Sequence, residues 1–135
     1  MPWVLQLSDA QRDWFRQHGR ALAESLLVHL DEPAGETGRV GLAAATAEAA
    51  EYGRMACRLG LSLSQGVEGF LEFRRPFMHQ LALSAGRRGI DAAMTTDLME
   101  AAERAMDRLL LAAMSAQSIE RVADGRRDED SEGLV

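Results

Sequence analysis

Residues 96–123 carry one uninterrupted apolar stripe, and this feature limits the possible folds more than any other. The apolar residues follow one another in alternating steps of four and three: Leu98, Ala102, Ala105, Leu109, Ala112, Ala116, Ile119 and Ala123. Such steps keep side chains on one face of an α-helix and are typical of a helix bundle or a coiled coil. The sequence therefore predicts a closing helix of about 40 Å at 1.5 Å per residue.

A stripe of this length also predicts a contact with a second chain. We expect a homodimer whose interface is formed by the stripe itself: Leu98, Ala102, Ala105, Leu109, Ala112, Ala116 and Ile119. A protein partner or an output module attached to this helix is the other kind of partner that the pattern predicts.

The composition favours helices in the rest of the chain. The hydrophobic residues, 47% of the total, are mainly Ala, Leu and Met rather than the β-branched and aromatic residues that strands prefer. A chain of 135 residues fits one domain. We predict an all-α, single-domain bundle of four to five helices over residues 1–123, and a disordered acidic tail over residues 124–135, where large apolar side chains are scarce.

Capping residues predict where these helices begin and end. Ser8 with Gln11 and Ser62 with Gln65 have the spacing of capping boxes, and Gly60 is suited to a left-handed helix end. The expected helices before the closing one are 8–30, 39–59 and 62–85.

Proline and threonine residues predict two further features of the helices. Pro76 predicts a kink or a break near Phe73, because proline removes one backbone hydrogen bond. Thr95 or Thr96 is the expected cap of the closing helix.

Charge and targeting features exclude several classes of protein. The net charge is −6 and no cluster of basic residues extends beyond Arg pairs, so we expect no nucleic-acid partner. No apolar run approaches the ~20 residues that a membrane span needs, and no secretory signal precedes Ser8. With Cys57 as the only cysteine, a cytoplasmic location is expected, and inert packing is the expected role of its thiol.

Catalytic and metal-binding patterns are missing from the sequence, so we expect no enzyme activity, metal or cofactor. His18 and His29 lie about 16 Å apart along a helix, too far to share an ion. The alternative is a haem-binding or small-molecule-binding globin-like protein, in which His79, which lies near large apolar residues, or His29 would be the haem ligand.

Arg74 is the most unusual charged residue, because its neighbours on the same helical stripe are apolar: Val67, Phe70, Phe77 and Leu81. A guanidinium among such residues must find a partner. We take Arg74, Arg75 and Tyr52 as candidate anchors for an anionic ligand or an interhelical pair. We expect an acidic or carbonyl partner inside the core; the alternative is a packed stem with its charged end at the surface.

Several short runs resemble one family of bacterial proteins. They are Tyr52-Gly53-Arg54, Gly60-Leu61-Ser62-Leu63, Val67 with Phe70, Phe73-Arg74-Arg75 and Ala105-Met106-Asp107-Arg108-Leu109-Leu110. Together they resemble the N-terminal sensor domains of the RsbT co-antagonist (RsbRD-type) family. The resemblance implies a globin-like helical fold without haem, dimers, and a role in stress-response or transcriptional signalling.

The closing part of the sequence departs from that family, because no output domain follows Ala123. A free-standing sensor or adaptor and an excised domain are both compatible with this pattern. We expect a non-enzymatic signalling domain that acts through dimerisation and helix repacking.

Overall fold

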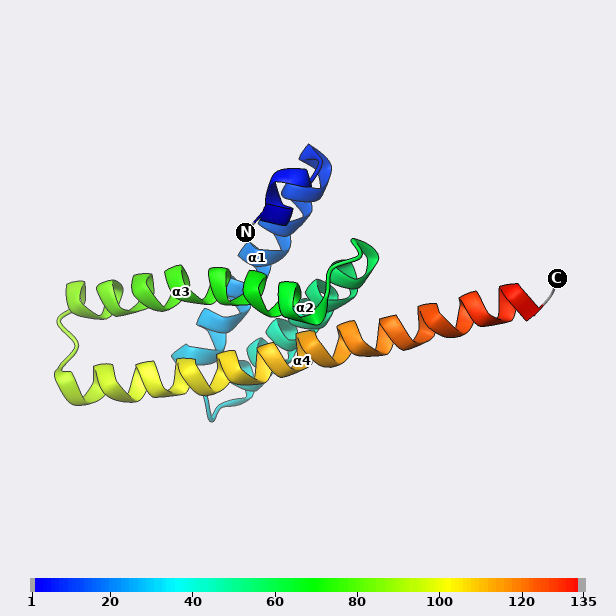
Figure 1. Ribbon diagram of the computed structural model, residues 1–135. Helices are drawn as coiled ribbons and strands as arrows, with labels where there is room; N and C mark the ends of the chain where they lie inside the picture. The colour runs from blue at the N-terminus through cyan, green and yellow to red at the C-terminus, as the bar shows by residue number, and fades with distance from the viewer. Residues whose placement is uncertain (1, 134–135) are drawn as a thin grey trace.

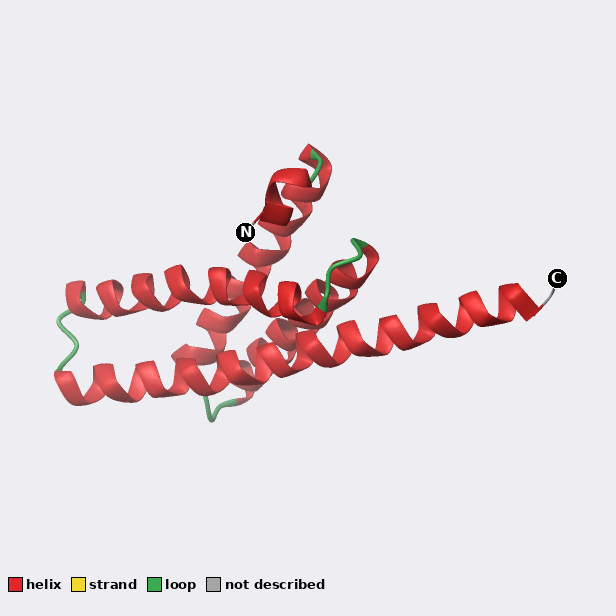
Figure 2. Cartoon of the chain, in the orientation of Figure 1, coloured by secondary structure: helices red, strands yellow, loops and turns green. Residues whose placement is uncertain are grey.

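The computed structural model describes residues 2–133 and the side chains of residues 2–129, and this part of the chain is all-α (Figures 1 and 2). A short 3-10 helix, η1 (Pro2–Gln6), precedes four α-helices: α1 (Asp9–Asp31), α2 (Glu36–Arg58), α3 (Leu63–Arg87) and α4 (Ala92–Gly133). The predicted single helical bundle with a long C-terminal helix is confirmed. None of the helices within residues 2–133 has both the length and the apolar character needed to cross a bilayer.

Helix α2 holds the bundle together because it packs against both α1 and α4, while α3 packs against α4. Figure 1 shows α3 and α4 running side by side from the loop that joins them, with the C-terminal part of α4 extending beyond the other helices. The main core combines large side chains with alanines that let the helices approach: Leu22, Leu26, Leu30, Ala45, Ala49, Phe70, Leu81, Ala102, Ala105, Met106, Leu109 and Ala113.

Two glycines of α2 allow the closest helix contacts. A Cβ atom on Gly53 would overlap the backbone carbonyl of Ala113 in α4, and one on Gly41 would lie 2.8 Å from the carbonyl oxygen of Ser25 in α1. Any larger residue would therefore push backbone atoms apart. Small residues, glycine as much as alanine, therefore allow the close contacts of this helix.

The predicted turn chemistry is confirmed at three of the boundaries. Ser8 and Ser62 both form complete capping boxes, with Gln11 and Gln65 as their partners. Gly60 has a positive φ of 76°, which favours glycine because it lacks a Cβ atom. These residues account for the sharp corner between α2 and α3.

Helix α2 begins at Glu36 rather than near residue 39, so the first connection is shorter than predicted. Gly38, which was expected in the connection, lies in the first turn of α2. Its carbonyl oxygen lies 2.9 Å from Nδ1 of the buried His29, and this contact ties the start of α2 to the end of α1.

Pro76 does not break α3, which runs as one helix from Leu63 to Arg87. Helix α4 also begins earlier than predicted, at Ala92. Asp91 provides the cap instead of a threonine, because its Oδ1 accepts a hydrogen bond from the Met94 amide at 2.8 Å.

Helix α4 continues beyond its predicted end at Ala123. The expected disordered tail is helical as far as Gly133, and its last two residues lie outside the described part of the chain. Within this extension Arg127 pairs with Asp124 one turn earlier at 3.2 Å. Backbone hydrogen bonds within a helix need no apolar partner, so a scarcity of apolar residues predicts exposure here better than it predicts disorder.

Candidate ligand-binding site

An apolar cavity of about 380 Å³ lies where η1, α1, α2 and α3 meet. Its walls are mostly aromatic or aliphatic: Trp3, Val4, Leu7, Trp14, Phe15, Leu22, Tyr52, Phe70 and Phe73. Cavities of this size with apolar walls and a few polar groups are the usual form of small-molecule sites in proteins.

Neighbouring aromatic rings connect the four elements around this cavity. Phe15 of α1 lies between Trp3 and Tyr52, with ring centroids 5.9 Å from each. Tyr52 then contacts Phe70 of α3 at 6.2 Å, and Phe70 contacts Phe73 at 6.1 Å. Phe15, His18 and Leu22, which follow one another at helical spacing on α1, all line the cavity, and Leu22 also belongs to the main core.

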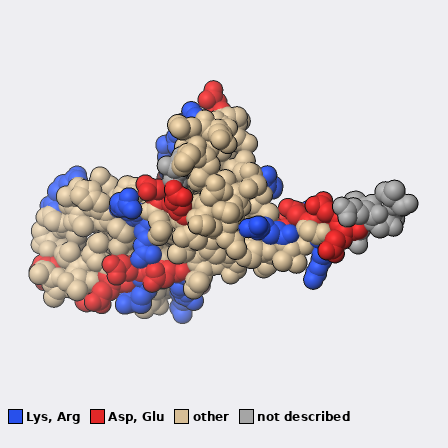
Figure 3. Space-filling model, in the orientation of Figure 1, with Lys and Arg blue, Asp and Glu red and all other residues tan. Residues whose placement is uncertain are grey.

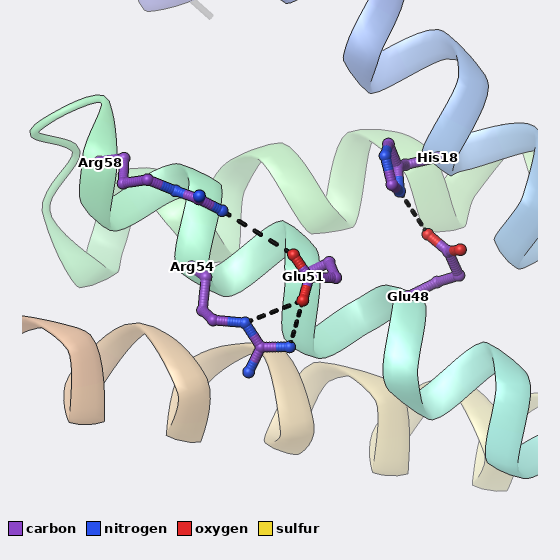
Figure 4. A network of polar contacts seen from close by, with 5 residues as sticks. All are labelled: His18, Glu48, Glu51, Arg54 and Arg58. Atoms are coloured by element: carbon purple, nitrogen blue, oxygen red, sulfur yellow. Dashed lines mark hydrogen bonds and ion pairs between the residues drawn. The ribbon is translucent and has the colours of Figure 1, made fainter.

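A few polar side chains also line the cavity. Nδ1 of His18 in α1 is 2.6 Å from Oε2 of Glu48 in α2. Figure 4 shows the two side chains pointing toward each other. The ring of Trp14 stacks on His18 with a centroid distance of 4.0 Å. Arg12 and Arg16 also line the cavity, and Arg16 is paired with Asp13 at 2.9 Å.

Tyr52 closes the inner wall, and its hydroxyl group donates a hydrogen bond to the Gly66 carbonyl oxygen at 2.7 Å. Burial raises the pKa of this hydroxyl well above its ordinary value, because the phenolate would lose its hydration. Tyr52 therefore acts as a neutral link between α2 and α3 rather than as a proton donor or acceptor in a reaction.

We expect alkaline pH to destabilise the fold through Tyr52. Above about pH 10 the unfolded chain releases the phenol proton while the folded chain keeps it, so the free energy of unfolding falls as the pH rises. For one such group, the free energy of unfolding falls by up to about 1.4 kcal/mol for each pH unit. Absorbance at 295 nm follows this residue alone, because it is the only tyrosine.

The matched control is Tyr52→Phe, which loses the hydrogen bond but has no proton to release. Its unfolding free energy at pH 7 should be lower than that of the parent by about 1 kcal/mol. The difference in unfolding free energy between the parent and Tyr52→Phe should narrow between pH 10 and 11. A constant difference would show that burial does not raise the Tyr52 pKa.

The three predicted anchors do not form one site. Nη1 of Arg74 pairs with Oδ1 of Asp107 in α4 at 3.0 Å, and Arg75 pairs with Glu72 on its own helix. The Arg74 side chain is 23% exposed and its partner 66%, so the predicted acidic partner is present but lies at the surface rather than inside the core. Only Tyr52 lines the cavity.

The predicted dimer stripe packs largely against other helices of the same chain. Ala102, Ala105, Leu109 and Ala116 are buried against the chain's own helices, whereas Leu98 and Ala112 are partly buried. Ile119 is 69% exposed. The predicted dimer interface is therefore corrected for these four buried residues, because they pack within the chain itself.

The histidines do not support haem binding through His79. This residue is exposed on α3 and does not line the aromatic cavity, where His18 lies instead. Among the side chains that the structure describes, no group of three His, Cys, Asp or Glu residues could hold a metal ion.

Cys57 lies beside α4, with its Sγ atom 3.6 Å from Oδ2 of Asp124. Burial and this carboxylate raise the pKa of the thiol, so it is less reactive than a free cysteine. Arg121 opposes this effect in part, and the neighbouring Arg54 is paired with Glu51 (Figure 4).

Two residues that the sequence did not single out hold important positions. Gln117 is fully buried, and its Nε2 donates to the carbonyl oxygens of Leu61 at 3.0 Å and Ser62 at 3.1 Å. It thereby fastens α4 to the corner between α2 and α3. Trp3 is 9% exposed and lines the cavity, although it precedes the first predicted helix.

The charged surface gives no sign of a nucleic-acid site on the face that Figure 3 shows. Blue and red atoms are interspersed there, and the basic side chains form no continuous patch. This distribution agrees with the net charge of −6.

Comparisons with known proteins identify no relative. No family model matches the sequence, and no curated protein or solved structure matches it. The resemblance to the RsbT co-antagonist family therefore stays a prediction, and the aromatic cavity is the main guide to function.

Proposed function

We propose that this chain is a non-enzymatic sensor or adaptor domain whose aromatic cavity binds a small apolar molecule. The observation that carries the proposal is the cavity itself, which combines about 380 Å³ of volume, aromatic walls and a few polar groups. Filling such a space would remove apolar surface from water and stabilise the arrangement of the surrounding helices.

Helix α4 is the proposed route by which binding is signalled. The cavity touches α2 through Tyr52 and Glu48, and α2 packs against α4. A change in the position of α2 would therefore alter the packing of α4, whose end extends beyond the bundle (Figure 1).

The proposed output is the pairing of α4 with a second copy or with another signalling protein. Leu111, Ile119 and Val122 support this part of the proposal, because they are large apolar residues of α4 that remain exposed. A role in bacterial stress-response or transcriptional control follows from the family resemblance alone and belongs to the same proposal.

Ethylbenzene is a suitable probe for the cavity, since it is small, apolar and uncharged. We expect the protein to bind it, with isothermal titration calorimetry or ligand-induced NMR shifts as the measurement. Gly19→Met should weaken that binding about tenfold or more, a change of about 1.4 kcal/mol, because the new side chain would occupy the cavity. A Cβ atom at Gly19 meets only the Phe73 ring, at 3.9 Å, so the variant should fold.

Gly86→Met is the matched control, because a Cβ atom at Gly86 meets nothing within 4 Å and the residue does not line the cavity. Both substitutions replace a helical glycine, so both should leave the fold as stable as the parent or slightly more stable. Equal binding of ethylbenzene by the two variants would contradict the proposal, as would a parent protein that does not bind it.

A further inference from the structure

The carboxylate of Glu48 has only one of its two oxygens paired within the described part of the chain. Oε2 lies 2.6 Å from Nδ1 of His18, whereas no described residue donates a hydrogen bond to Oε1. Glu48 lines the aromatic cavity, and its side chain is only 26% exposed. A carboxylate accepts hydrogen bonds at both oxygens but cannot donate one. The cavity wall therefore carries an acceptor that can take a donor from a ligand.

The contact with His18 holds this acceptor in place. Because a carboxylate only accepts, Nδ1 of His18 carries the hydrogen of that contact, and Nε2 of the neutral imidazole is an acceptor as well. The ring of Trp14 stacks on the imidazole with a centroid distance of 4.0 Å and restrains it further. This pair therefore offers acceptors rather than donors to a molecule in the cavity.

The two arginines of the cavity do not call for an anionic ligand. Both lie at exposed positions, where water can satisfy their donors. Arg16 is paired with Asp13 at 2.9 Å, and Arg12 reaches the carbonyl oxygen of Leu5 at 3.4 Å. An anionic ligand beside Glu48 would be repelled by its carboxylate, and an ion of either sign would lose hydration among largely apolar walls. An uncharged donor avoids both costs.

We propose that the cavity selects uncharged ring compounds that carry a hydroxyl group, such as phenols, and that this hydroxyl donates a hydrogen bond to Oε1 of Glu48. The inference rests on the proposed ligand-binding function and adds the chemical class of the ligand. The aromatic walls favour a flat ring by offset or edge-to-face contact, and a hydrogen bond to an ionised acceptor is stronger than one between neutral groups.

The probes that test this inference are ethylbenzene and para-ethylphenol, which differ only by a hydroxyl group. Glu48→Met keeps an unbranched side chain of similar length but removes the acceptor. The preference for para-ethylphenol, measured as the ratio of the two affinities by calorimetry, should therefore fall about tenfold, as expected for a hydrogen bond to a charged group. Comparing ratios cancels the difference in hydration between the probes and any effect of the variant that both probes share.

Glu51→Met is the matched control, because Glu51 is also an acidic residue of α2 but does not line the cavity. Its carboxylate pairs with Arg54 instead (Figure 4). The affinity ratio of this variant should equal that of the parent. A ratio that falls equally in both variants would overturn the inference, because the preference would then not come from Glu48.

A carbon-13 NMR spectrum of the parent gives a second readout that needs no Glu48 variant to fold. The side-chain carboxyl signal of Glu48 should shift when para-ethylphenol binds and much less when ethylbenzene binds, because only the phenol donates a hydrogen bond. The Glu51 signal should stay in place with both probes. The anion para-ethylbenzoate, in which a carboxylate replaces the hydroxyl group, should bind more weakly than para-ethylphenol.

The outcomes separate the two proposals. If both uncharged probes bind but Glu48→Met leaves their ratio unchanged, or the Glu48 signal responds to them equally, the hydroxyl inference is overturned while ligand binding stands. If para-ethylbenzoate binds as tightly as para-ethylphenol, the selection of uncharged compounds is overturned. If neither uncharged probe binds, the proposed function is overturned and the inference falls with it.

Discussion

Leu109→Glu should abolish folding rather than separate two folded subunits. Leu109 is fully buried in the main core, where α4 packs against its own chain. A carboxylate there would lack a partner, and burying an unpaired charge costs several kcal/mol even after relaxation. Since a domain of this kind is stable by only about 5–15 kcal/mol, we expect circular dichroism to show an unfolded or strongly destabilised chain.

Ile119→Glu is the matched control, because it makes a similar apolar-to-acidic change on the same helix at a residue that is 69% exposed. Its stability should stay within about 0.5 kcal/mol of the parent. If the parent is a dimer through the exposed apolar residues of α4, light scattering should show a lower mass for this variant. A Leu109→Glu protein with the parent's melting curve would contradict the packing of α4 described above.

Gly53→Ala should have the second large effect, although it adds only one methyl group. The added carbon would overlap the Ala113 carbonyl group, which is backbone and cannot turn aside. To make room, α2 and α4 would have to separate along their main contact. We expect a loss of about 3 kcal/mol or more, at the upper end of the range for overpacked cores, measured by denaturant unfolding.

Gly86→Ala gives the opposite expectation for the same chemical change. This glycine lies near the end of α3, and an added Cβ atom meets nothing within 4 Å. Alanine should stabilise the helix by up to about 1 kcal/mol, because it loses less backbone freedom on folding. Equal effects at the two positions would mean that the α2 and α4 backbones are not as close as the structure places them.

The helices could be predicted from the sequence because their signals are local. The capping boxes at Ser8 and Ser62 and the turn at Gly60 depend on residues within four positions of one another, and all three appear in the structure. The long closing helix that carries the apolar stripe was also predicted correctly. Periodicity cannot say whether such a stripe meets the same chain or another, and here the partner of Leu109 is the chain's own core.

The cavity could not be predicted, because its walls come from four separate elements. Trp3 and Phe73 line the same cavity only after three changes of chain direction, and no sequence spacing records that arrangement. The apolar neighbours of Arg74 predicted a partner inside the core. Its long side chain instead lets the guanidinium group reach Asp107 at the surface. The sequence held one signal for the cavity: aromatic residues are scarce, at 5% of the chain, and most of them line the cavity.

The most direct test of the proposed function is to locate bound ethylbenzene by intermolecular NMR contacts. Nuclear Overhauser effects should connect its protons with Phe15, Leu22 and Phe70, which line the aromatic cavity. Gly19→Met should remove these contacts, whereas Gly86→Met should keep them. Contacts only with exposed apolar residues such as Leu111 and Ile119, or no contacts at all, would contradict the account.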